Sequence, residues 1–191
     1  MKIVYHKSPV YHVIIYDFFS SEEYTQLQKE IDYLLSTDET ILDEHHKKIS
    51  FCNIKTWQLD SIYNTKRSES KLLTSTARAF EVPLDRTQFP FADLLPLTNL
   101  DTSYLHAYKN NSYYMKHRDN SYMTFLFNFW KKDTFNGGEL EFTDYSYRPH
   151  LTANSLLIFP GNVMHHVNLL SQDDETLDRV ILNRRCWIEM K

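Results

Sequence analysis

The sequence LLIFPGNVMHHV, residues 156–167, decides the fold class. An apolar run is followed by a Pro-Gly turn and then by a histidine that opens a second short apolar run, which is typical of two β-strands joined by a tight turn. From residue 101 onward the chain repeats such strand-like runs without a helical pattern between them. The runs cover residues 102–108, 122–130, 139–142, 155–159, 165–169 and 179–187. Short strands in this number predict a sandwich or a barrel.

The N-terminal part of the chain predicts helices that come before this β-core and support it. Residues 11–19 favour a strand, and Ser-Ser-Glu-Glu at 20–23 is a capping-box signature for a helix that follows. Apolar residues then recur at helical spacing, at Tyr24, Leu27, Ile31, Leu34 and Leu35. A second helix is expected over residues 68–80. We therefore expect one domain, residues 1–191, of the mainly β class with N-terminal helices (α+β), in which residues 1–100 provide helical support and flanking strands.

Length and composition exclude several classes of protein. The 191 residues suit a single domain, and a formal net charge of −4 gives no general attraction to nucleic acid or to an anionic membrane. Two cysteines, Cys52 and Cys186, cannot form a disulfide framework. The chain has no apolar run of the ~18 residues that a membrane span needs, and its N-terminus lacks the apolar segment of a signal peptide. We expect a soluble protein of the reducing cytoplasm.

A histidine and a carboxylate that could share a metal ion stand two positions apart, in His117-Arg118-Asp119. In a strand both side chains face the same side. The alternative is a strand-edge histidine beside a solvated aspartate, since short motifs also arise by chance. His165 and His166 point to opposite faces of a strand, and one of them can supply a third ligand. Two histidines and one carboxylate leave coordination positions open, which favours Fe(II), whereas structural zinc uses four protein ligands.

Four motifs follow one another in the second half of the chain. They are YKNNSYYMKHRD at 108–119, GGELEF at 137–142, FPGNVMHHV at 159–167 and RVILN at 179–183. In order and spacing they resemble the Fe(II)/2-oxoglutarate-dependent dioxygenases, in the branch similar to prolyl 4-hydroxylases. Asn111 stands where the family pattern has glycine. The resemblance implies a double-stranded β-helix, a jelly-roll and cupin-like fold, for a catalytic core at residues 101–191.

The resemblance also implies the metal ligands, which are His117, Asp119 and His165. The family's second histidine is followed by x-Val, which fits His165-His166-Val167 and makes His166 an outward polar residue. His45 and His46 stand in a charge-rich segment where exposure to solvent is the commoner explanation.

Further residues are implied for the co-substrate and the substrate. The distal carboxylate of 2-oxoglutarate would be buried and needs a cation, which the resemblance identifies as Arg179. Tyr108 contributes a hydroxyl, Asn128 adds a donor and Tyr114 lines the substrate pocket. For Arg179 the alternative is a surface cation that pairs with Asp174 or Asp178. Gly137-Gly138 is expected to form a hairpin turn.

The predicted function is hydroxylation of an unactivated C–H bond, with Fe(II), 2-oxoglutarate and O₂ required and ascorbate as a possible aid. A prolyl residue in a peptide or protein is the first substrate hypothesis, and a free amino acid or small metabolite is the alternative. Arg179 and Arg185 also resemble the Arg-x₅-Arg ending of oxygenases that dealkylate nucleic acids, although the acidic balance disfavours that substrate. A non-catalytic cupin-like binding module remains as an alternative of another class. The residues leave the substrate, the oligomeric state and the loops at 42–63, 83–100 and 145–150 open.

Overall fold

The computed structural model describes residues 1–38, 52–130, 136–171, 177 and 179–189. Its largest element is a seven-stranded antiparallel sheet. The strand order across that sheet is β1 (Lys2–His6), β2 (His12–Tyr16), β9 (Leu156–Pro160), β6 (Met123–Trp130), β12 (Arg179–Trp187), β4 (Leu100–Tyr108) and β3 (Ile54–Gln58).

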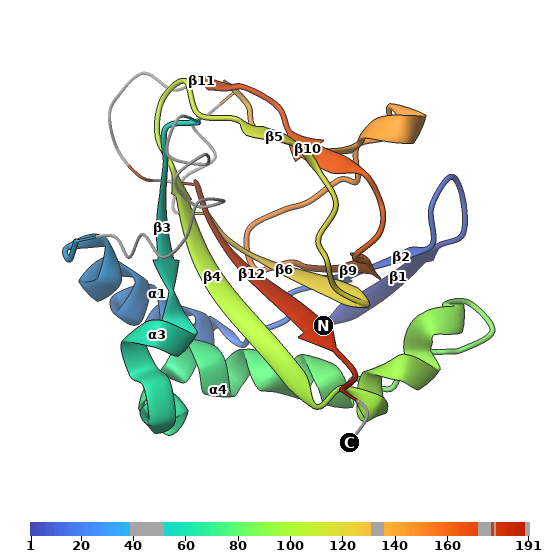
Figure 1. The fold of residues 1–191 in the computed structure, drawn as a ribbon, viewed down its shortest axis with the longest axis horizontal. Coiled ribbons are helices and arrows are strands. Elements are labelled where there is room, and N and C mark those ends of the chain that lie inside the picture. Colours follow the sequence, from blue (N-terminus) through green and yellow to red (C-terminus); the bar gives the residue numbers. More distant parts are fainter. Residues whose placement is uncertain (39–51, 131–135, 172–176, 178, 190–191) are drawn as a thin grey trace.

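A smaller sheet faces the large one and closes the jelly roll (Figure 1). It consists of β5 (Tyr114–His117), β10 (His165–Val167) and β8 (Leu140–Phe142), and a two-stranded ladder of β11 (Leu170–Ser171) and β7 (Asn136–Gly137) continues it. The mainly β fold class with N-terminal helices is therefore confirmed, and the two facing sheets form a double-stranded β-helix.

Helices cover the outer face of the large sheet (Figure 1). α1 (Ser21–Leu35) begins with the predicted capping box, in which Ser20 and Glu23 each accept a hydrogen bond from the other's backbone amide. α4 (Lys71–Ala77) continues into the 3-10 turns η2 (Arg78–Glu81). The short helix α3 (Leu59–Tyr63) follows β3 in the sequence and is continued by the 3-10 helix η1 (Asn64–Glu69). A further 3-10 helix, η3 (Pro90–Leu97), precedes β4. No helix in the described ranges is long and apolar enough to span a membrane.

Two apolar cores lie on opposite faces of the large sheet, and side chains of β12 contribute alternately to one and the other. Val180, Leu182 and Cys186 pack towards the helices, and Ile181 packs towards the small sheet. Arg179 and the other odd-numbered residues of β12 share the inner face with Ile181 because side chains of a strand alternate between faces. That inner face, enclosed between the sheets, is where the predicted site residues gather.

Three expectations about the fold were wrong. The helices do not all precede the β-core: β2 lies within the strand expected at 11–19, but β1 and β3 were not expected, and all three strands join the large sheet. The strand expected at 165–169 ends at Val167, and the chain resumes pairing in β11. Gly137-Gly138 is not a hairpin turn, because β7 and β8 on either side of it pair with β11 and β10. Both glycines have positive φ, at 75° and 72°, and make a kink between two successive strands.

Candidate metal and co-substrate site

Three side chains from two neighbouring strands converge on one point inside the jelly roll. His117 ends β5, His165 begins β10, and these two residues are direct partners in the β5–β10 ladder. Asp119 follows β5, with its Oδ1 3.5 Å from His117 Nε2 and its Oδ2 3.7 Å from His165 Nε2. Each of these three residues offers one ligand atom, and the three atoms lie within 4.8 Å of one another, so the residues could bind a single metal ion.

The orientation of both imidazoles fits a metal ion. His117 Nδ1 lies 2.8 Å from the carbonyl oxygen of Met115, and His165 Nδ1 lies 2.9 Å from that of Val163. If Nδ1 donates in each pair, each Nε2 keeps its lone pair towards Asp119, which is the tautomer that a metal-binding histidine requires. Two imidazoles and one carboxylate suit Fe(II) with open positions. Burial lowers the pKa of His165 to about 4, which keeps its ring neutral and able to coordinate.

Two polar side chains of the large sheet hold the Asp119 carboxylate. Thr124 donates a 2.7 Å hydrogen bond to Oδ2, and Arg185 Nη2 lies 2.8 Å from Oδ1. Burial raises the pKa of Asp119, but the contact with His117 and the charge of Arg185 together lower it well below its usual value. The carboxylate is therefore ionised, as a metal ligand must be.

A close backbone approach fixes the segment that carries Asp119. A β-carbon on Gly161, in the turn between β9 and β10, would lie 3.0 Å from the Asp119 carbonyl oxygen and would collide with Ser121. The absence of a side chain at Gly161 lets the Asp119 segment pack directly against the turn that leads to His165.

Arg179 is fully buried on the inner face of β12 rather than on the surface. Its guanidinium lies 4.3 Å from the centre of the Tyr108 ring, on the adjacent strand β4. Its Nε and Nη1 have no hydrogen-bond partner within the described residues. Burial lowers the pKa of Arg179 and raises that of Tyr108. A buried guanidinium with unused donors is suited to receive an anion, since such a charge is costly without a partner.

Tyr114 and Asn128 have contacts that refine their predicted roles. The ring of Tyr114 stacks on that of His117, with centroids 4.5 Å apart, and its hydroxyl is buried without a partner, while Tyr113 is exposed. The Asn128 amide nitrogen lies 3.1 Å from Ser155 Oγ and 3.2 Å from the Ser155 carbonyl oxygen. Since its donors are directed at Ser155, Asn128 presents an unpartnered buried carbonyl instead.

Other candidates lie apart from this centre or outside the described residues. His166 points away from the ligands and makes polar contacts with Thr143 and Asn168. The histidines at 45 and 46 and the aspartates at 174 and 178 fall outside the described residues.

The sequence analysis missed the roles of Thr124, Arg185 and Gly161 around Asp119. The available signal was strand alternation, which puts Arg185 on the same face as Arg179. The Arg185 contact depends on the β12–β6 register, which pairs Arg185 with Thr124 and is not readable from local sequence.

Comparisons with known proteins show similarity in structure. No protein-family model matches the chain, and no curated protein matches it in sequence. A Pseudomonas putida prolyl-4-hydroxylase is similar in structure, with a TM-score of 0.61 and 13% identity over 95% of both chains. A Trichoplax adhaerens prolyl hydroxylase, solved with a hypoxia inducible factor peptide fragment, has a TM-score of 0.64 and 14% identity over 93% of this chain and 83% of its own.

A third similar structure is HygX from Streptomyces hygroscopicus, solved with nickel and 2-oxoglutarate bound. It has a TM-score of 0.58 and 11% identity over 91% of this chain and 80% of its own. At these identities the comparisons show a shared fold, which agrees with the double-stranded β-helix that the sequence motifs implied.

Proposed function

We propose that this chain, which has the fold of the Fe(II)/2-oxoglutarate oxygenases, is itself such an enzyme and hydroxylates an unactivated C–H bond. The observation that carries the proposal is the pairing of two features on the enclosed face between the sheets. One is the His117, Asp119 and His165 group, and the other is the buried, unpartnered guanidinium of Arg179. A metal ion with open positions and a nearby anion receptor are what a 2-oxo dicarboxylic acid needs to bind through both ends.

His117, Asp119 and His165 would hold Fe(II), which with 2-oxoglutarate and O₂ supplies the oxidising chemistry. The overall reaction is R–H + 2-oxoglutarate + O₂ → R–OH + succinate + CO₂. Arg185 helps to keep the Asp119 carboxylate ionised, and the hydrogen bond from Thr124 fixes its direction. Because a carboxylate occupies this position, a halide has no vacated ligand site, which favours hydroxylation over halogenation.

Arg179 and Tyr108 would receive the distal carboxylate of 2-oxoglutarate. The guanidinium is pre-placed by its contact with the Tyr108 ring, and its unused Nε and Nη1 can donate to that carboxylate. Burial strengthens the interaction, because competing water is excluded from the pair.

A prolyl residue of a peptide or protein is the proposed substrate. Supporting it are the similar prolyl hydroxylases, one of which was solved with a peptide. The Tyr114 ring beside His117 gives an aromatic surface that can pack against a proline ring. A free amino acid is the alternative substrate. With both cysteines, Cys52 and Cys186, free and buried, we propose that the enzyme acts in the reducing cytoplasm.

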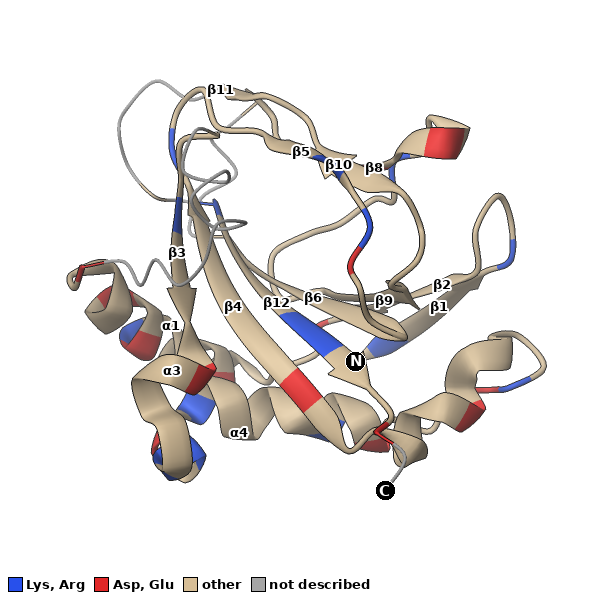
Figure 2. Ribbon diagram, viewed as in Figure 1, with Lys and Arg blue, Asp and Glu red and all other residues tan. Residues whose placement is uncertain are grey.

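Nucleic-acid dealkylation is a second candidate. The contact between Arg185 and Asp119 favours this reaction, because it brings the second arginine of the Arg179-x₅-Arg185 pattern to the proposed metal site. Against it, Figure 2 shows Lys and Arg interspersed with Asp and Glu along the helices rather than gathered in one basic stripe.

The test is an anaerobic Fe(II)-loading experiment followed by addition of O₂ and 2-oxoglutarate with a panel of substrates. The panel contains proline-containing peptides, free amino acids and methylated oligonucleotides, and products are read by mass spectrometry. A gain of one oxygen on a peptide supports the prolyl proposal, whereas loss of a methyl group from an oligonucleotide would favour the second candidate. Binding of 2-oxoglutarate without succinate formation would support a non-catalytic binding module.

A further inference from the structure

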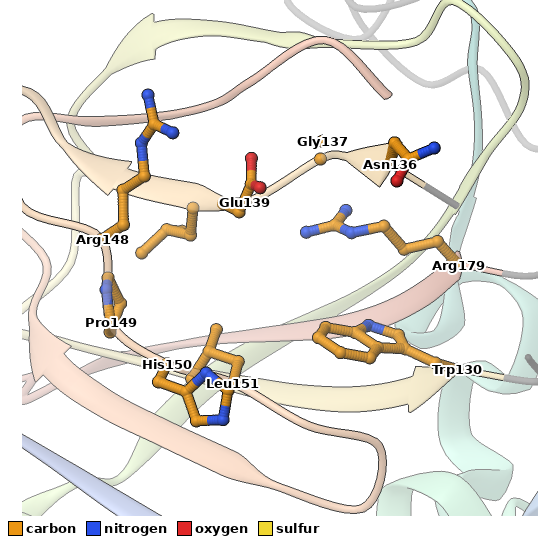
Figure 3. Close-up of a pocket in the computed structure, with 11 residues that line it drawn as sticks. Trp130, Asn136, Gly137, Glu139, Arg148, Pro149, His150, Leu151 and Arg179 are labelled. Carbon is orange, nitrogen blue, oxygen red and sulfur yellow. The ribbon is translucent and has the colours of Figure 1, made fainter. Parts of the chain in front are cut away.

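Two separate spaces adjoin the proposed co-substrate residues. The outer one is a cavity of about 390 Å³, lined by Trp130 of β6, by Asn136 and Gly137 of β7 and by Arg179 of β12, among others. Figure 3 shows the Arg179 guanidinium reaching into this cavity above the Trp130 ring, with Arg148, Pro149 and His150 on the opposite wall. Its volume lies in the range of roughly 300–1,000 Å³ that accommodates drug-sized ligands.

The inner space adjoins the metal ligands and is much smaller. It is lined by His117, His165, Tyr108 and Leu140, among others, and its volume is about 20 Å³. A cavity needs about 10–15 Å³ to hold a single water molecule. 2-Oxoglutarate, a five-carbon diacid, therefore cannot occupy the inner space until a side chain moves.

Leu140 lines both spaces and forms the partition between them. It lies in β8 opposite Val167, and its side chain is 2% exposed. Arg179, which lines the outer cavity, rests on Tyr108, which lines the inner space. A ligand that contacts Arg179 from the outer cavity and extends towards the histidines therefore meets Leu140 between the two spaces.

We propose that 2-oxoglutarate reaches its site through the outer cavity, and that Leu140 is the side chain that moves aside to admit it. This inference rests on the proposed function. The distal carboxylate keeps contact with Arg179, while the keto-acid end advances past Leu140 towards the metal ligands. The outer cavity thus binds the diacid first, on the side of Arg179 away from the metal.

The charges around the cavity are compatible with a diacid that arrives from this side. Arg148 Nε donates to Glu141 at 2.8 Å, so that cation is already paired at the rim. Glu139 lies on the cavity wall and is exposed to solvent, which screens its charge. Arg179 is therefore the arginine of the cavity wall that forms no salt bridge with a described carboxylate, and its buried Nε and Nη1 have no hydrogen-bond partner among the described residues.

The experiment follows 2-oxoglutarate binding to the Fe(II)-loaded protein without O₂, by rapid mixing and tryptophan fluorescence. Trp130 lies in the outer cavity, whereas Trp57 is buried in the helix-side core. Leu140→Ala should raise the association rate constant about tenfold, and Leu140→Phe should lower it about tenfold, as expected for a change of about 1.4 kcal/mol in the barrier. Leu151→Phe, which narrows the outer cavity from its far wall, should also slow association.

Leu97→Phe is the matched control, because Leu97 is 56% exposed in η3 and lines neither space. It should leave the rate unchanged, and Trp130→Phe should remove most of the signal. Circular dichroism of each variant identifies any that fail to fold. If the Leu140 variants do not fold, Leu151→Phe still tests the route, because it leaves Leu140 in place.

Equal association rate constants in the wild type and in every folded variant at Leu140 and Leu151 would overturn the outer route while leaving the proposed function intact. A wild type that binds 2-oxoglutarate by calorimetry without any Trp130 signal would also overturn it. Absence of binding by calorimetry would instead refute the proposed function itself.

Discussion

Replacing Arg179 by leucine should have opposite effects on ligand binding and on the stability of the ligand-free protein. The guanidinium is buried, and two of its nitrogens lack partners in the described structure. An unpaired buried charge opposes folding, so replacing it by an apolar side chain should leave the free energy of unfolding unchanged or raise it. The substitution would, however, remove the guanidinium that we propose as the receptor for the distal carboxylate of 2-oxoglutarate.

The loss of binding follows from what the guanidinium would do for a buried carboxylate. Removing one partner of a desolvated charge pair costs about 2–5 kcal/mol. At about 1.4 kcal/mol per factor of ten, Arg179→Leu should weaken 2-oxoglutarate binding roughly 30-fold to several thousand-fold. Calorimetric titration of the Fe(II)-loaded protein without O₂ gives this dissociation constant, and chemical denaturation gives the free energy of unfolding.

Arg184→Leu provides a matched control in the same strand. Arg184 points to the opposite face, where it donates to Asp101, Thr76 and the Leu73 carbonyl oxygen. Because its loss breaks a buried pair, it should cost about 3–5 kcal/mol and lower the Tm by roughly 6–20 °C. Should Arg179→Leu lower the Tm as Arg184→Leu does while 2-oxoglutarate binding persists, Arg179 would be a structural cation and the reasoning would be refuted.

Three further predictions concern the metal ligands and a buried histidine. Calorimetric titration should show that His165→Ala abolishes Fe(II) binding, while His166→Ala leaves the Fe(II) affinity unchanged. The reverse result would show that the register of β10 is off by one residue. Arg185→Met should weaken Fe(II) binding about 10–100-fold, since it removes the contact that orients Asp119, and an unchanged affinity would contradict that role. Burial lowers the pKa of His12 to about 4, below the ~6.5 of the unfolded chain, so its contribution to stability is full above pH 6.5. That contribution, about 3 kcal/mol, should be lost as the pH falls to 4, and denaturation curves of His12→Phe should show a shallower dependence across this window.

The strands with continuous apolar runs were predictable from the sequence. β6, β9 and β12 lie within one residue of their expected bounds, because central strands that are buried on both faces need apolar residues throughout. Among the strands of the large sheet, β1 and β3 were missed. Both lie at edges of the large sheet, where one side of the backbone has no partner and mixed polar sequence such as Ile54–Gln58 is tolerated.

The clustering of three candidate ligands agrees with the sequence prediction, but the contacts that support them could not be predicted. The structure brings His117, Asp119 and His165 together, and it was the resemblance of the surrounding motifs to the dioxygenases, rather than spacing alone, that singled them out. Thr124 and Arg185 reach Asp119 only because β5 of the small sheet lies across from β6 and β12. The donors of Asn128 were likewise assigned to a ligand because nothing local reveals that Ser155 lies beside them.

The most direct test of the central claim measures succinate formed from 2-oxoglutarate by the Fe(II)-loaded protein in the presence of O₂. The account predicts succinate in amounts that depend on Fe(II), 2-oxoglutarate and O₂ together, and none from Asp119→Ala, while His166→Ala retains most of the wild-type rate. Fe(II) bound tightly by His117, Asp119 and His165 without any succinate, with or without the substrate panel, would contradict the assignment of this chain as a 2-oxoglutarate oxygenase.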